Sequence, residues 1–188
     1  MLDGRKTQTR RIMKPQPEPC PRGGHWWPSN VFKTMLHVED EMQNGKGGWG
    51  GLVGDACPFG DVGDRIWVRE AFASGLSTKS TLAYRATHKR EDLEDGFYDT
   101  IKWTPSIHMP RWASRILLET TDVRVERLKS ISDGDAIREG CSIADMKSGD
   151  CVADVFARLW ASIYGAESWN ANPWVWVIEF KRVEGGAA

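Results

Sequence analysis

The apolar run near the end of the chain, Trp174 to Val183 (WVWVIEFKRV), places the strongest constraint on the fold. Its residues are mostly β-branched or aromatic, and neither glycine nor proline interrupts them. Such a composition is typical of a strand in the middle of a sheet or in a barrel. We therefore predict a central or barrel strand here, and any fold for this chain must include it.

Three more strands are predicted ahead of this run. Residues 65–72 (RIWVREAF) follow a Gly-Asp turn and alternate apolar with polar side chains, and residues 82–85 form a second, shorter candidate. Residues 116–128 (ILLETTDVRVERL) combine spaced apolar positions with β-branched residues. This last segment predicts a long or bulged strand.

Two helices are predicted between the third strand and the final one. A capping box of Ser132 and Asp135 predicts a short helix over residues 133–139, which Gly140 ends. Apolar residues at helical spacing then predict an amphipathic helix that Gly165 ends; they are Val152, Val155, Phe156, Leu159, Trp160 and Ile163.

Short strands with hairpin-like punctuation and two short helices predict an α+β fold, with a small mixed β-barrel as the favoured architecture. The length of 188 residues favours a single domain over residues 1–188. Residues 15–60 begin with alternating prolines and continue with many glycines, and only residues 31–42 have room for a short helix or strand. We predict a long irregular loop insertion over residues 15–60, a feature that favours a functional loop over packing.

The composition excludes several classes of protein. With 40% apolar residues and a net charge of −1, the chain is expected to be globular and cytoplasmic, because no apolar run approaches the ~20 residues of a membrane span and no signal peptide is recognisable. No membrane partner is expected. The balanced charge argues against coating of nucleic acid by bulk electrostatics, but it leaves room for a local basic patch.

The cysteines and tryptophans indicate packing more than metal chemistry. Cys20, Cys57, Cys141 and Cys151 are scattered without CxxC spacing, so free thiols are expected in a reducing compartment. A zinc site from Cys20, His25 and Cys57 is conceivable, but structural zinc takes its ligands in close pairs. We therefore expect no metal and no other cofactor. Most of the ten tryptophans are expected in the core.

The segment from Gly4 to Arg11 (GRKTQTRR) places an amine and two hydroxyls in a strongly positive local field. Taken alone, it is compatible with a frayed, solvated tail. It is also compatible with chemistry, because a lysine whose pKa is lowered by burial or nearby cations can remove the proton of a threonine hydroxyl. Lys6 and Thr9 are three residues apart, so their side chains would meet if both lay on one turn.

Three segments in this order resemble the ASCH family, a branch of the PUA-like β-barrels: Gly4–Arg10, Gly63–Arg69 and Trp176–Phe180. The shared features are a glycine-lysine-threonine turn, a Gly-Asp pair before the next strand and an apolar final strand. The resemblance runs from the first residues to the last strand, apart from the insertion at about 15–60. Many family members begin with a further strand and helix, so we expect either a naturally short chain or a start codon upstream of Met1.

The resemblance implies a function and three catalytic residues. The ASCH family is thought to include nucleic-acid binders, nucleases and amidohydrolases that remove the acetyl group of N(4)-acetylcytidine. By resemblance to the amidohydrolases, Lys6 is the proton acceptor, Thr9 the nucleophile and Glu139 the proton donor to the leaving amine. Residues expected to bind the substrate lie beside Lys6, on the predicted strand after the Gly-Asp turn or in the proline-bracketed segment 103–112; they are Arg5, Arg10, Trp67, Arg69, Glu70, His108 and Arg111.

Alternatives remain open from the sequence. One is a binding module for RNA or modified nucleic acid, with Arg111 or Arg115 on phosphates and tryptophans stacked on bases; another is a ribonuclease of the same family. In the alternative without catalysis, Lys6 is a surface cation, Thr9 a strand residue and Glu139 a solvated helix end. Segment 103–112 is a packed corner in this alternative and a wall of a ligand pocket in the functional one.

Overall fold

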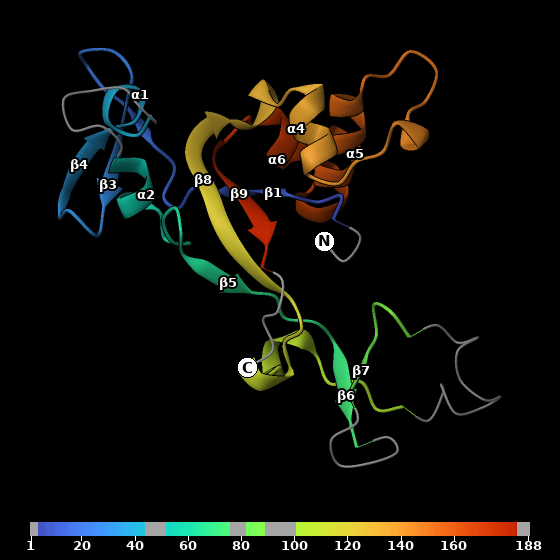
Figure 1. The fold of residues 1–188 in the computed structure, drawn as a ribbon. Coiled ribbons are helices and arrows are strands. Elements are labelled where there is room, and N and C mark those ends of the chain that lie inside the picture. The colour runs from blue at the N-terminus through green and yellow to red at the C-terminus, as the bar shows by residue number, and fades with distance from the viewer. Residues whose placement is uncertain (1–3, 44–51, 76–81, 89–100, 184–188) are drawn as a thin grey trace. The chain divides into compact units, whose positions relative to one another are not determined.

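The computed structural model describes residues 4–43, 52–75, 82–88 and 101–183 (Figure 1). The chain divides into two compact units, which we describe separately. Unit 1 contains Met1–Arg65 and Glu119–Arg182, and unit 2 contains Ile66–Leu118 and Val183–Ala188. The secondary structure is mixed α and β, which confirms the predicted α+β class. No helix in the described ranges is long and apolar enough to cross a membrane.

The main sheet is antiparallel and has the strand order β1-β9-β8-β5. Because β8 bends along its length, the sheet is curled like half of a barrel (Figure 1). In the register of β1 and β9, Thr9 lies opposite Ile178. The predicted strands at 116–128 and 174–183 are confirmed, whereas the strand predicted at 65–72 is shorter. The observed bounds are β1 Gln8–Ile12, β5 Arg65–Trp67, β8 Leu117–Arg127 and β9 Trp174–Arg182.

Strand β9 is buried on both faces, which explains its uninterrupted apolar sequence. Trp174, Trp176 and Ile178 contribute to a core on one face, while Val175 and Val177 contribute to a second core on the other. Side chains alternate between the faces of a strand, so a strand between two cores needs apolar residues at every position. The final strand is therefore the centre of unit 1.

Helices cover the face of β9 that carries Val175 and Val177 (Figure 1). The predicted capping box is present: the Ser132 hydroxyl accepts a hydrogen bond from the Asp135 backbone N–H at 3.1 Å. Gly140 and Gly165 adopt positive φ angles at the helix ends, as C-terminal glycines do. Both predicted helices are confirmed. The bounds are α4 Asp133–Arg138, α5 Val152–Tyr164 and α6 Ala166–Asn170, with one-turn 3₁₀ helices at Leu128–Ser130 and Ile143–Asp145.

The prediction of an irregular loop over residues 15–60 is wrong for most of the segment that the structure describes. A three-stranded sheet and two short helices form there, and their buried side chains pack on the Trp174 and Trp176 face of β9. Packing against β9, which no local pattern in this segment reveals, stabilises these short elements. Residues 44–51, which include five of the glycines, lie outside the described ranges. The elements are β2 Glu18–Pro19, β3 His25–Ser29, β4 Thr34–His37, α1 Val38–Glu41 and α2 Leu52–Ala56.

Unit 2 is small and has its own core. Phe72, Met109 and Ala113 are buried there, and Trp67 and Tyr84 pack against them. Phe72 and Tyr84 belong to a short antiparallel hairpin, while Met109 follows one 3₁₀ turn and Ala113 ends a second. The elements are β6 Phe72–Ser74, β7 Leu82–Tyr84, η2 Ser106–His108 and η3 Arg111–Ala113. The first 3₁₀ turn lies within the proline-bracketed segment 103–112, and the second begins there and ends at Ala113.

Candidate active site

Lys6 and Glu139 form a direct ion pair in unit 1. The Lys6 Nζ lies 2.9 Å from Glu139 Oε2 and donates a second hydrogen bond to the Glu139 carbonyl oxygen at 3.0 Å. The backbone N–H of Thr7 donates to the Arg138 carbonyl at 2.8 Å, which ties the segment before β1 to the end of α4. The Glu139 side chain is 3% exposed and that of Lys6 is 29% exposed. The amine therefore has access to solvent, whereas the carboxylate is buried.

The end of α4 determines where Glu139 lies. Glu139 is the C-cap of this helix, and Gly140 after it has a φ of 99°, a backbone conformation that favours glycine. A Cβ atom on Gly140 would lie only 3.3 Å from the Lys6 Cβ. Gly140 thus allows both the turn that ends the helix and the close approach of Lys6.

Lys6, Thr9 and Glu139 line one pocket of about 230 Å³. The structure therefore brings the three predicted catalytic residues to the same cavity. Arg10 and Arg11 line it with them on the polar side. The other side is apolar and belongs to α5, which contributes Phe156, Leu159, Trp160, Ile163 and Tyr164.

Thr9 reaches this pocket from a strand and not from a turn. It lies within β1, while Lys6 precedes the strand, so the shared turn suggested by their spacing is not formed. No hydrogen bond joins the Thr9 hydroxyl to Lys6 in the described part of the chain. A strand alternates its side chains between two faces, which separates residues that a helical turn would bring together.

Arg10 is fully buried and contacts three carboxylates. Its Nη1 lies 3.4 Å from Glu139 Oε1, and its Nη2 lies 3.1 Å from Glu126 Oε2 and 3.4 Å from Asp135 Oδ2. These contacts occupy the guanidinium edge that a substrate or an oxyanion would need. Arg10 thus holds Glu139, and because it also lines the pocket, its assignment as a substrate-binding residue stays a prediction.

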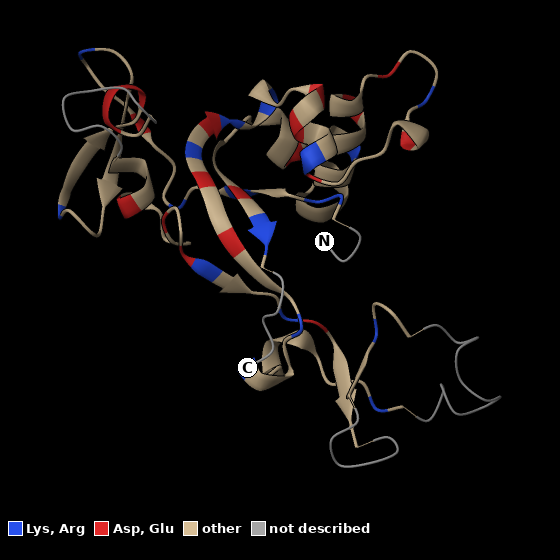
Figure 2. Ribbon diagram, in the orientation of Figure 1, with Lys and Arg blue, Asp and Glu red and all other residues tan. Residues whose placement is uncertain are grey.

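A wider network of charges surrounds Arg10. Arg124 on β8 bonds to Glu126, Glu179 and Asp135, and Figure 2 shows residues of both signs along this strand. Burial opposes ionisation of Asp135, but hydrogen bonds from Ser132 and Arg138 and the charge of Arg10 outweigh it and lower the pKa of Asp135 to about 2. The ionised groups of this network therefore hold α4 in place, and with it Glu139.

The other residues predicted to bind substrate do not line this pocket within the described chain. Arg5 is exposed just before Lys6. Glu70 is buried and accepts two hydrogen bonds from Arg115, at 2.8 and 2.9 Å, so it serves an ion pair. The remaining four, Trp67, Arg69, His108 and Arg111, belong to unit 2, where the guanidinium groups of Arg69 and Arg111 lie over the Trp67 ring.

The apolar wall from α5 was missed by the sequence prediction. These positions, apart from Tyr164, were expected only as the apolar face of an amphipathic helix, and Phe156 and Trp160 are indeed buried. Leu159, Ile163 and Tyr164 are 42, 62 and 41% exposed, however, and line the pocket. The sequence signal for this wall was the width of the apolar face of the helix, which is larger than packing against a single core requires.

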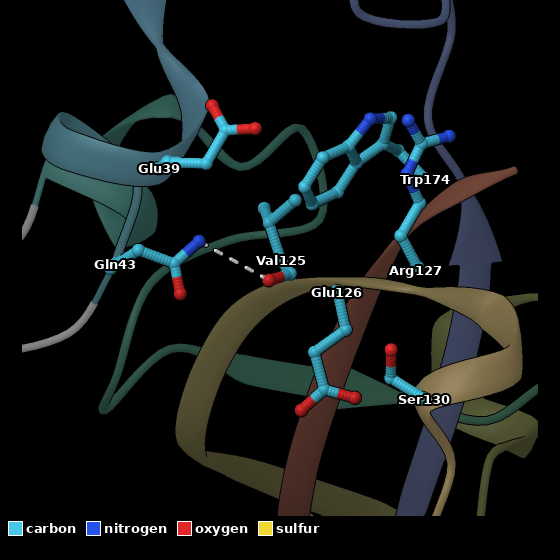
Figure 3. Close-up of a pocket in the computed structure, with 7 residues that line it drawn as sticks. All are labelled: Glu39, Gln43, Val125, Glu126, Arg127, Ser130 and Trp174. Atoms are coloured by element: carbon cyan, nitrogen blue, oxygen red, sulfur yellow. Dashed lines mark hydrogen bonds between the residues drawn. The ribbon is translucent and has the colours of Figure 1, made fainter. Parts of the chain in front are cut away.

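A second pocket in unit 1, of about 310 Å³, contains mainly paired groups (Figure 3). The Arg127 guanidinium lies 4.5 Å from the centre of the Trp174 ring and 3.0 Å from His25 Nε2. His25 Nδ1 lies 2.6 Å from Glu39. Because these charges stabilise one another, this pocket offers no set of free groups for catalysis. Its lining residues are Glu39, Gln43, Val125, Glu126, Arg127, Ser130 and Trp174.

No group of three or more His, Cys, Asp or Glu side chains is arranged to hold a metal ion within the described ranges. Cys20 and Cys57, the two thiols considered for zinc, are buried and free. Burial raises the pKa of the Cys57 thiol to about 11, which disfavours the thiolate that a metal needs. His25 is engaged with Glu39 and Arg127.

The pocket at Lys6 thus combines an amine, a buried carboxylate and a hydroxyl with an aromatic wall. Such a set is suited to proton transfer and nucleophilic attack on a small planar ligand. No protein-family model, curated protein or solved structure matches this chain.

Proposed function

We propose that this protein is an amidohydrolase that removes the acyl group from N(4)-acylated cytidine or a related nucleoside or base. The observation that carries the proposal is the 2.9 Å contact between Lys6 and Glu139 in a pocket that Thr9 also lines. The resemblance of Gly4–Arg10 to the ASCH family supports it. A PUA-like barrel acting in the cytoplasm belongs to the same proposal.

The Lys6–Glu139 hydrogen bond supplies both protonation states that the reaction needs. Moving one proton along it converts an ammonium and a carboxylate into a neutral amine and a carboxylic acid. A ligand that excludes water makes the neutral pair less costly, because the charged pair then loses its solvation. Lys6 becomes a base and Glu139 an acid in a single step.

The reaction then proceeds through an acyl-enzyme. As the Thr9 oxygen attacks the acyl carbonyl carbon, the Lys6 amine takes the hydroxyl proton. The bond between this carbon and N4 of cytosine breaks, and Glu139 gives its proton to the leaving amine. Water hydrolyses the Thr9 ester, and one amide and one water yield one carboxylic acid and one amine. Substrate binding has to bring the Thr9 hydroxyl within reach of Lys6.

The apolar wall provides a surface for the base. Tyr164 and Trp160 lie with ring centroids 4.5 Å apart along α5, and aromatic faces stack on planar rings. The pocket volume of about 230 Å³ is below the roughly 300 Å³ at which sites for drug-sized ligands begin. The pocket is therefore suited to an acylated base, with any sugar at the opening.

Incubation of the purified protein with N(4)-acetylcytidine, with cytidine release followed by chromatography, tests the proposal. Lys6→Ala, Thr9→Val and Glu139→Gln are each expected to lower kcat by at least about 100-fold. Lys147→Ala and Thr121→Val, which alter exposed residues outside the pocket, are matched controls and should keep full activity. Absence of turnover at high enzyme concentration, or full activity of Lys6→Ala, would refute the proposal.

A further inference from the structure

Three of the residues predicted to bind substrate, Trp67, Arg69 and Arg111, lie together on unit 2. The Trp67 ring has two guanidinium groups over it, that of Arg69 at 4.6 Å and that of Arg111 at 5.9 Å from the ring centroid. Arg69 Nη1 also donates to the carbonyl of Ile107 at 3.1 Å, which fixes the arginine beside η2. Both arginines are exposed, so they are positioned by the indole while their charges face solvent.

Trp112, next to Arg111, presents a second indole. Its side chain is 70% exposed, and that of Ile107 is 69% exposed. Its neighbour Ala113 is buried in the core of unit 2, so the 3₁₀ turn that carries Trp112 is anchored. An exposed tryptophan on an anchored turn is costly to keep in water, and a stacking partner would remove that cost.

The described charges of unit 2 are predominantly positive. Glu70 is the one acidic side chain in its described ranges, and Arg115 neutralises it at 2.8 Å. Arg69 and Arg111 are thus left with no acidic side chain of the described part of unit 2 to pair with. The two exposed guanidinium groups favour an anionic partner, and the exposed indole of Trp112 favours one with flat apolar faces. The basic side chains in these ranges are Arg69, Arg85, Lys102, Arg111 and Arg115, besides two histidines.

We infer that this surface of unit 2, formed by Trp67, Arg69, Ile107, Arg111 and Trp112, binds single-stranded nucleic acid. A base stacks on the Trp112 ring, and Arg69 and Arg111 contact the neighbouring phosphates. Such combinations of aromatic platforms and cations are how proteins bind single strands without reading their sequence. A duplex is excluded because its base faces are stacked on one another. This binding does not depend on the amidohydrolase activity proposed for the Lys6 pocket.

Fluorescence anisotropy of a labelled oligouridylate RNA of about 12 nucleotides, within the site sizes of single-strand binding proteins, tests the inference with the full chain. Uracil has no N4 amine, so the probe is not a substrate for the proposed deacylation. Trp112→Ala is expected to weaken binding at least about five-fold, whereas Trp112→Phe keeps most of the affinity. Arg111→Ala should reduce the slope of log affinity against log salt by about 0.7.

The controls distinguish binding at this surface from non-specific electrostatic binding and from effects on the Lys6 pocket. Arg22→Ala removes an exposed arginine of unit 1 and should leave binding unchanged. Trp112→Ala should keep its thermal midpoint and its turnover of N(4)-acetylcytidine. The inference is overturned if low salt shows no binding, if a duplex RNA of the same length binds as tightly, or if Arg22→Ala weakens binding as much as Arg111→Ala.

Discussion

At the scale of single residues, Glu139 is held by one cation on each carboxylate oxygen. Lys6 contacts Oε2 and Arg10 contacts Oε1, and both oxygens accept hydrogen bonds, as those of an ionised carboxylate do. The two cations differ in exposure, since Lys6 is partly exposed and Arg10 is fully buried. Lys6 is therefore accessible to a ligand, while Arg10 fixes the position of the carboxylate.

Replacement of Arg10 by methionine should damage both stability and activity. It leaves three carboxylates, on Glu126, Asp135 and Glu139, without their shared buried cation. Removal of one partner from a buried ion pair costs about 3–5 kcal/mol, so we expect a loss of this size in the free energy of unfolding. Urea denaturation measures it, and the kcat for N(4)-acetylcytidine should fall with little change in KM.

Arg158→Met is the control for this prediction, because Arg158 pairs with Asp150 at the surface and surface pairs contribute about 0–1 kcal/mol. Arg10→Lys keeps the charge but loses the fork of donors, so it should recover stability only in part. If Arg10→Met were as stable as the wild type, the buried cation would have no structural role.

At the scale of elements, the sequence predicted those whose stabilising signals are local. Helix α4 has its cap and its terminal glycine, α5 has a regular apolar face, and β8 and β9 have long β-branched runs. Strand β3 was missed because it is short, lies among prolines and glycines, and is stabilised by packing on Trp174 and Trp176 of β9. Strand β4 lies within residues 31–42, where the sequence left room for a short helix or strand. Such tertiary contacts are not visible in a local pattern.

In the candidate site, too, the residues with a local signal were predicted and those that depend on tertiary contacts were not. Glu139 could be placed because its helix has clear ends, and the resemblance supplied Lys6 and Thr9. The contacts of Arg10 could not be predicted, because its partners come from β8 and α4, more than 100 positions along the chain. The location of Trp67 and Arg111 in unit 2, and not at the Lys6 pocket, likewise depends on the fold.

Gly140→Ala tests how the end of α4 positions the ion pair. A residue other than glycine at a φ of 99° costs roughly 1–3 kcal/mol, and the added methyl group meets the Lys6 Cβ at 3.3 Å. We expect lower stability and, because Lys6 moves away from Glu139, at least about a 10-fold loss of kcat/KM. Thermal unfolding and deacetylation assays measure the two effects.

Gly149→Ala is the matched control. Gly149 has a φ of 87°, but no heavy atom lies within 4 Å of a Cβ built on it. This variant should lose a similar amount of stability and keep its activity. Equal activity losses in the two variants would show that backbone strain, and not the contact with Lys6, is responsible.

At the scale of the whole molecule, one network of ion pairs links several elements of unit 1 around Asp135. Arg10, Arg124 and Arg138 share Asp135, and together they connect β1, β8 and α4. Because β1 and the C-cap of α4 line the Lys6 pocket, we expect the ionisation of Asp135 to affect both the stability of unit 1 and the geometry of its site.

Asp135 should make stability depend on pH in the acid range. Its pKa is about 2 in the folded protein and near 4 in an unfolded chain, so the folded state favours the ionised form. The resulting stabilisation is fully present above about pH 4 and is lost as the pH falls toward 2. A shift of this size corresponds to about 2 kcal/mol.

Asp135→Asn should therefore unfold more easily than wild type at pH 7, with the difference shrinking toward pH 2.5. Asp145→Asn, which alters an exposed carboxylate, is the control and should follow the wild-type curve. Urea titrations at pH 7, 4 and 2.5 measure this, and a constant difference between Asp135→Asn and wild type would contradict the role of its ionised form.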